Sequence, residues 1–183
     1  MTLTLIKPPA LEPVTLAQAR QFLRLDDGGE DELLAGLVKA ARETLEMQAG
    51  LVLIDQIFRL HVDRWPAQGL VSIAKHPVRA IVSVTAYGKE GAPVPIAGNE
   101  MHLEAASRPA RLHLGSRPAG TSALDIDFTA GFGETGADVP DALRHAILNL
   151  VAHWYEYRGV DGAARQYPPA FERTAGLWRR VSI

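Results

Sequence analysis

The sequence predicts an α+β protein: a helical bundle of two N-terminal helices and a long C-terminal helix, an inserted block of short antiparallel β-strands, and an extended C-terminal tail. Apolar residues recur at helical spacing in the first fifty residues and again over 140–158. Between about 52 and 132 the period changes to two, and Gly, Pro and Ser clusters interrupt it. We therefore expect an extended arm over 1–13, a single domain over 14–159 and a docking tail over 160–183.

Three helices are expected, at about 15–25, 31–49 and 140–158. Thr15 and Gln18 have the spacing of a capping box, in which each side chain satisfies the other residue's backbone N–H. The second helix has an acidic first turn, which suits the positive end of a helix dipole, and Gly50 is a natural stop. Pro140 suits the start of the third helix, because its missing N–H would have no intrahelical partner there.

The strand block contains one clear alternation and one strongly β-forming run. Phe58, Leu60 and Val62 alternate with polar residues, which is typical of a half-buried strand. Ile81–Tyr87 is rich in β-branched residues. Further short strands are expected at Val71–Ile73, Val94–Ile96, Met101–Leu103, Arg111–Leu114 and Leu124–Phe128.

Composition excludes several classes of function. The 183 residues contain no cysteine, which removes disulfides, thiolate metal sites and cysteine nucleophiles. The net charge of -2 argues against a protein that grips nucleic acid tightly, because such proteins carry a basic excess. No apolar run approaches the roughly 18 residues of a membrane span, and the N-terminus lacks the pattern of a signal peptide. We expect synthesis in the cytoplasm and no membrane partner.

Residues with catalytic or ligand chemistry are present but poorly spaced. His145, Asn149 and His153 share one helix face, yet eight residues separate the two histidines by about 12 Å, too far to share a metal. Asp125 and Asp127 alternate on a strand with Leu124, Ile126 and Phe128, and two such carboxylates could hold a divalent ion or form an acid–base pair. Because no third ligand is evident nearby, we expect a solvent-facing polar strand face instead. The Gly131–Gly133 turn lacks the phosphate-loop pattern, and acidic residues follow it. We expect no catalytic residue, no metal and no cofactor.

The C-terminal tail has no helical period and contains Pro168-Pro169, so it is expected to be mobile in the isolated subunit. Its tip mixes a large aromatic residue with apolar and basic ones, as interface hot spots do. The alternative is a frayed terminus with Trp178 against the domain. We interpret the tip as a docking site made of Leu177, Trp178, Arg179, Arg180, Val181 and Ile183.

The order of these elements resembles the head–tail connector (adaptor) proteins of long-tailed phages and of phage-derived gene transfer agents. The resemblance covers most of residues 14–159. It rests on stretches that recur in the same order and spacing, namely 14–26, 31–50, 56–66 with its Asp63-Arg64-Trp65-Pro66, 76–87, 129–140 and 146–158.

The resemblance implies a structural protein without catalysis. Members of this family form a ring, typically of twelve subunits, below the portal protein of a DNA-filled head. The ring meets a neck or stopper protein on the tail side, and DNA passes through its lumen without sequence-specific binding. The C-terminal segment of such adaptors reaches toward the portal. The alternatives are another neck or tail-completion protein, a small hydrolase, or a β-rich binding module.

Overall fold

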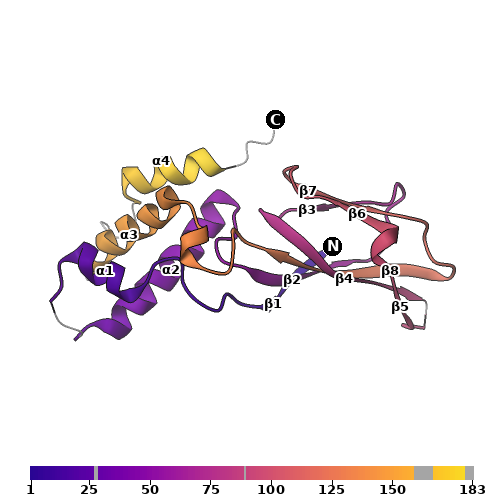
Figure 1. The fold of residues 1–183 in the computed structure, drawn as a ribbon, viewed down its shortest axis with the longest axis horizontal. Coiled ribbons are helices and arrows are strands. Elements are labelled where there is room, and N and C mark those ends of the chain that lie inside the picture. Colours follow the sequence, from indigo (N-terminus) through magenta and orange to yellow (C-terminus); the bar gives the residue numbers. More distant parts are fainter. Residues whose placement is uncertain (27–28, 89, 159–166, 180–183) are drawn as a thin grey trace. The chain divides into compact units, whose positions relative to one another are not determined.

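The computed structural model of the protein describes residues 1–26, 29–88, 90–158 and 167–179 (Figure 1). The described helices are α1 (Leu16–Leu23), α2 (Asp31–Ala49), α3 (Asp141–Glu156) and α4 (Pro169–Trp178). The described strands are β1 (Thr2–Lys7), β2 (Gln56–Val62), β3 (Leu70–Ile73), β4 (Val78–Gly88), β5 (Pro93–Pro95), β6 (Met101–Glu104), β7 (Ala110–Leu114) and β8 (Thr121–Ala130). Two short 3-10 helices, Gly98–Glu100 and Gly136–Asp138, complete these elements. The α+β class is thus confirmed.

The chain divides into two compact units, and each unit is built from two separate segments of the sequence. The β unit consists of Met1–Pro9 and Asp55–Phe132, and the helical unit consists of Ala10–Ile54 and Gly133–Ile183. The segment expected as one domain, 14–159, therefore contributes to both units.

The β unit contains two antiparallel sheets. The larger sheet has the strand order β1-β2-β8-β4-β5, and the smaller one has the order β3-β7-β6. In β2 and β8, buried apolar side chains alternate with polar ones, as the sequence predicts. The rings of Phe58 and Phe128, paired across these strands, stack with centroids 5.7 Å apart. The buried residues of the smaller sheet include Val71, Ile73 and Leu112.

The N-terminal residues differ from the expectation of an arm outside the domain. Thr2–Lys7 forms β1, which pairs antiparallel with β2 at an edge of the larger sheet. The six residues alternate Thr and Leu in part, but the sequence of a single strand does not indicate its partner, and paired residues of β1 and β2 are 50 to 59 positions apart.

The helical unit packs its four helices by their apolar stripes. α2 contacts α1, α3 and α4, and α3 contacts α1 and α4. Thr15 and Gln18 form the predicted capping box, and Gly50 ends α2 in the left-handed conformation at φ 65°. Leu150 is fully buried as predicted, whereas Trp154, expected beside it in the core, is half-buried.

The prediction of an extended C-terminal tail is wrong for residues 169–178, which form α4. Phe171 and Ala175, four residues apart, are both buried, so they make the apolar stripe that holds the helix in place. Pro169 opens the helix rather than breaking it. A stripe of two residues is too short to stand out as a period in the sequence.

Candidate partner-binding surfaces

The end of α4 displays the described part of the predicted docking tip. Leu177 is 87% exposed, although the same helix buries Phe171 and Ala175. Trp178 is half-buried and Arg179 is exposed. The remaining predicted docking residues, Arg180, Val181 and Ile183, lie outside the described residues. The helix therefore presents a large apolar side chain to solvent at its C-terminal turn.

A small hollow adjoins this end of α4. It has a volume of about 170 Å³, and Gln48 of α2 and Phe171, Glu172 and Arg179 are among the residues that line it. Its rim carries one carboxylate and one guanidinium. The hollow is too small for a drug-sized ligand but can take one side chain of a partner.

A larger apolar groove crosses the helical unit. Two adjoining hollows of about 490 and 550 Å³ share Val14, Gln18 and Arg144 as lining residues. The guanidinium of Arg144 donates a hydrogen bond to Asp141, whereas its Nε is buried without a partner among the described residues. Phe22, 39% exposed, lies at the second hollow with its ring edge-on to His145. The lining of the groove combines apolar residues with the guanidinium of Arg144 and the carboxylates of Glu12 and Asp141.

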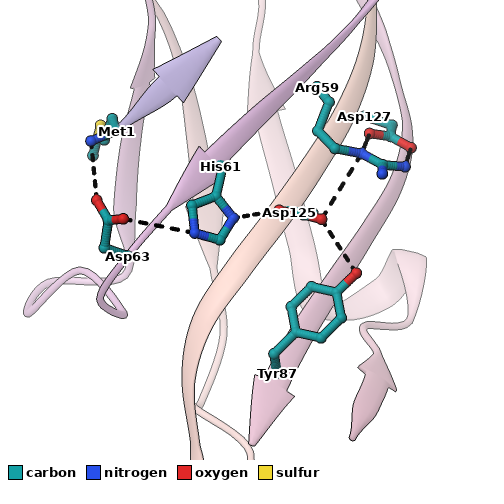
Figure 2. A network of polar contacts seen from close by, with 7 residues as sticks. All are labelled: Met1, Arg59, His61, Asp63, Tyr87, Asp125 and Asp127. Atoms are coloured by element: carbon teal, nitrogen blue, oxygen red, sulfur yellow. Dashed lines mark hydrogen bonds and ion pairs between the residues drawn. The ribbon is translucent and has the colours of Figure 1, made fainter. Parts of the chain in front are cut away.

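A polar network covers one face of the larger sheet (Figure 2). Arg59 of β2 donates two hydrogen bonds to Asp127 of β8, from Nε to Oδ1 at 2.7 Å and from Nη2 to Oδ2 at 2.8 Å. The neighbouring Asp125 lies 2.6 Å from Nδ1 of His61 and accepts a hydrogen bond from the hydroxyl of Tyr87 at 3.2 Å. The strand register explains these contacts, because Arg59 is paired with Asp127 and His61 with Asp125.

The same network continues to the N-terminus. His61 lies 3.6 Å from Asp63, whose carboxylate accepts a hydrogen bond from the amino group of Met1 at 3.1 Å (Figure 2). Alternating basic and acidic groups thus run from the N-terminus across the polar face of β2 to β8. Hydrogen bonds and ion pairs between these side chains hold the strands together.

The expectation that Asp125 and Asp127 face solvent needs correction. Their side chains are 16% and 15% exposed, because Arg59, His61 and Tyr87 cover them. The hydrogen bonds from Arg59 lower the pKa of Asp127 below its ordinary value of 3.8. Burial, followed by the charge of Asp125, raises the pKa of Tyr87. Both aspartates act as structural acceptors.

The other polar residues considered from the sequence have local structural roles. Asn149 and His145 are hydrogen-bonded at 2.9 Å along α3, and the rings of His153 and Tyr157 lie tilted to one another with centroids 4.9 Å apart. Gly131, at φ 149°, lies so close to Asp55 that a Cβ there would be 2.5 Å from its carboxylate. That turn is filled by its own chain rather than open to a phosphate.

Residues 1–26, 29–88, 90–158 and 167–179 hold no group of three or more His, Cys, Asp and Glu side chains placed to bind a metal ion. Within the same ranges, every helix is too short or too polar to cross a membrane.

Comparison with solved structures gives matches along the whole chain. Each of three matches covers 100% of this chain and 97% of the matched chain. One is from the neck of an empty gene transfer agent (GTA) particle computed with C6 symmetry, at 28% identity and a TM-score of 0.86. Another is from the virion of a native GTA particle, at 29% identity and 0.84. The third is from the neck of a native GTA particle computed with C12 symmetry, at 26% identity and 0.82.

No protein-family model and no curated protein sequence matches this chain significantly. The structural matches confirm the resemblance to neck proteins of gene transfer agents. The matched chains are structural components of particles, so this chain is placed with structural proteins and not with enzymes.

Proposed function

We propose that the chain is a head–tail connector (adaptor) subunit in the neck of a gene transfer agent or a related tailed phage. The observation that carries this proposal is the match to neck chains over 100% of the sequence, with TM-scores of 0.82–0.86. A match that spans both compact units indicates that the whole chain, rather than one shared module, has the neck architecture.

The subunit is proposed to act as one member of a closed ring. Two of the matched necks were computed with C6 and C12 symmetry, which supports a cyclic assembly and is compatible with twelve subunits. In this proposal the portal protein lies on the head side, a neck or stopper protein lies on the tail side, and DNA passes through the lumen. The net charge of -2 supports a conduit, since a subunit without basic excess holds duplex DNA weakly.

The end of α4 and the residues after it are proposed to dock on the portal. Leu177 supports this, because the helix is anchored by Phe171 and Ala175 and yet exposes an apolar side chain at its last turn. Arg179 adds a cation beside it, and Trp178, Arg180, Val181 and Ile183 complete the proposed docking site. Anchoring the helix fixes where the apolar side chain is presented and so lowers the ordering cost of binding.

The function is tested by locating the chain in particles. Particles are produced from cells that express the chain with a small tag, and the neck is imaged by electron microscopy with a tag-specific label. We expect label between head and tail with cyclic symmetry, and we expect deletion of the chain to give DNA-filled heads without tails. Label on the tail shaft or on the capsid surface, or tailed particles after deletion, would contradict the proposal.

A further inference from the structure

Among the described residues, the larger sheet ends in a strand that has a neighbouring strand on one side only. β1 is the terminal strand, and its described partner is β2, with Leu3 paired with Leu60 and Leu5 paired with Phe58. All six residues of β1 are exposed. The outer edge of such a strand carries backbone N–H and C=O groups that a further strand can pair with.

Apolar side chains continue across the sheet up to this edge. Leu60 and Phe58 are 7% and 5% exposed in β2, whereas their neighbours Leu3 and Leu5 in β1 are 40% and 47% exposed. Ile6, close to the bulge in the pairing, is 49% exposed. The apolar face of the sheet is therefore covered at β2 and left uncovered at β1. Exposed apolar groups beside free backbone groups are the usual composition of a contact surface.

The opposite edge of the same sheet is protected. β5 has three residues, and two of them, Pro93 and Pro95, are prolines that cannot donate a backbone hydrogen bond. Short length and proline are devices by which proteins block pairing at an edge. β1 is twice as long, contains no proline, and carries its one charge at Lys7, its last residue. The two edges differ in the way expected if β1 pairs with something and β5 does not.

A second copy of this chain is the occupant that the comparisons favour. In a cyclic ring each subunit meets its two neighbours through two different surfaces, so an edge on one copy need not face the same edge on the next. Two of the matched necks were computed with cyclic symmetry.

We infer that the free edge of β1, together with Leu3, Leu5 and Ile6, is a subunit contact covered by the neighbouring copy of this chain in the ring. The inference rests on the proposed neck function and adds the surface that closes the ring. The contact combines backbone pairing along the edge with burial of the apolar side chains beside it.

Photocrosslinking of single-cysteine variants tests this contact, since the natural chain has no cysteine. Thr4→Cys places a thiol in the exposed middle of β1, and Val94→Cys, in the β5 edge, is the matched control. Each full-length variant is labelled with a maleimide–benzophenone, assembled into particles and irradiated. We expect Thr4→Cys to give a product of twice the 19.8 kDa chain mass and Val94→Cys to give none.

The outcomes separate this inference from the proposed function. A product that joins Thr4→Cys to a different particle protein overturns the inference, as does the absence of any product when the chain is present in the neck. Equal chain–chain products from both edges also overturn it. If the chain is missing from particles altogether, the proposed function fails first and the inference falls with it.

A charge placed at the contact gives an independent readout. Ile6→Glu is compared with Val82→Glu, an exposed apolar position on β4 of the same sheet that is 55% exposed. We expect Ile6→Glu to abolish incorporation of the chain into necks while its far-ultraviolet circular dichroism and unfolding midpoint match those of Val82→Glu. Normal incorporation of Ile6→Glu would overturn the inference.

Discussion

At the scale of single residues, the pairing of Arg59 with Asp127 shows how charged side chains on a strand face can hold two strands together. The two residues are 68 positions apart in the sequence, yet the register of β2 and β8 places them side by side with two short hydrogen bonds. The geometry is bidentate, which is the strongest arrangement for a guanidinium and a carboxylate. It joins β8, the central strand of the larger sheet, to its neighbour β2 on their polar face.

This pair predicts a dependence of stability on pH. The pKa of Asp127 is lower in the folded protein than in the unfolded chain, because Arg59 donates hydrogen bonds to the ionised carboxylate. Its contribution is therefore fully present above the unfolded pKa, near 4, and is lost as the pH falls through the lower folded pKa. We expect Asp127→Asn to destabilise the protein at pH 7 and to flatten the decline of unfolding free energy between pH 7 and pH 3.

Urea unfolding at several pH values measures this effect. Glu90→Gln, which removes an exposed carboxyl from the same unit, is the control for the loss of one negative charge. The same pH slope in Asp127→Asn as in the wild type would show that the pair does not contribute.

At the scale of elements, α4 carries on one short helix both a residue that stabilises the fold and a residue that is proposed to dock. Phe171 is 1% exposed and Leu177 is 87% exposed, although they lie less than two turns apart. Truncation of a buried phenylalanine costs about 3–5 kcal/mol, a large share of the stability of a typical domain. Replacement of an exposed leucine costs little, since it removes no packing.

We therefore expect opposite effects from two substitutions in α4. Phe171→Ala should lower the free energy of unfolding by about 3–5 kcal/mol and expose residues 169–178 to proteolysis. Leu177→Glu should leave stability unchanged but produce heads without tails. Calorimetry, limited proteolysis and electron microscopy of particles measure these effects, with Met47→Glu, 72% exposed on α2, as the control for an added charge. Tailed particles from Leu177→Glu would remove α4 from the proposed portal contact.

At the scale of the whole molecule, the net charge is compatible with a proposed ring subunit that lines a DNA channel without binding the DNA tightly. The net charge is -2, and basic groups such as Arg42 and Arg59 are engaged with carboxylates of the same chain. A protein that binds duplex DNA without sequence preference typically has a Kd of about 10⁻⁴–10⁻⁶ M at physiological salt, through cations that replace counterions.

The free chain is accordingly expected to bind duplex DNA more weakly than that range. Fluorescence anisotropy with a labelled duplex at two salt concentrations tests this prediction. A double variant, Glu90→Lys with Glu134→Lys, changes two exposed carboxylates to cations and should gain affinity that falls as salt rises. Tight, salt-dependent binding of duplex DNA by the natural chain would contradict the proposal that the ring lets DNA pass without holding it.

The local helices and strands could be predicted from the sequence alone, because the patterns that predict them lie in neighbouring residues. Helical period, the capping box at Thr15 and the glycine stop at Gly50 predicted α1 and α2, and alternation predicted β2 and β8. The order and spacing of these elements also carried the resemblance that the solved structures support.

Pairings between distant segments were decided by the tertiary structure alone. β1 forms through its pairing with β2, a distant segment of the sequence. α4 is held by the burial of Phe171 and Ala175 in the helical unit. The sequence predicts that Asp125 and Asp127 face solvent, whereas in the structure Arg59, His61 and Tyr87 cover them. The same physical reason applies to β1, to α4 and to the two aspartates. Contact and burial depend on which residues meet in space, whereas a period along the chain indicates only which face of an element is apolar.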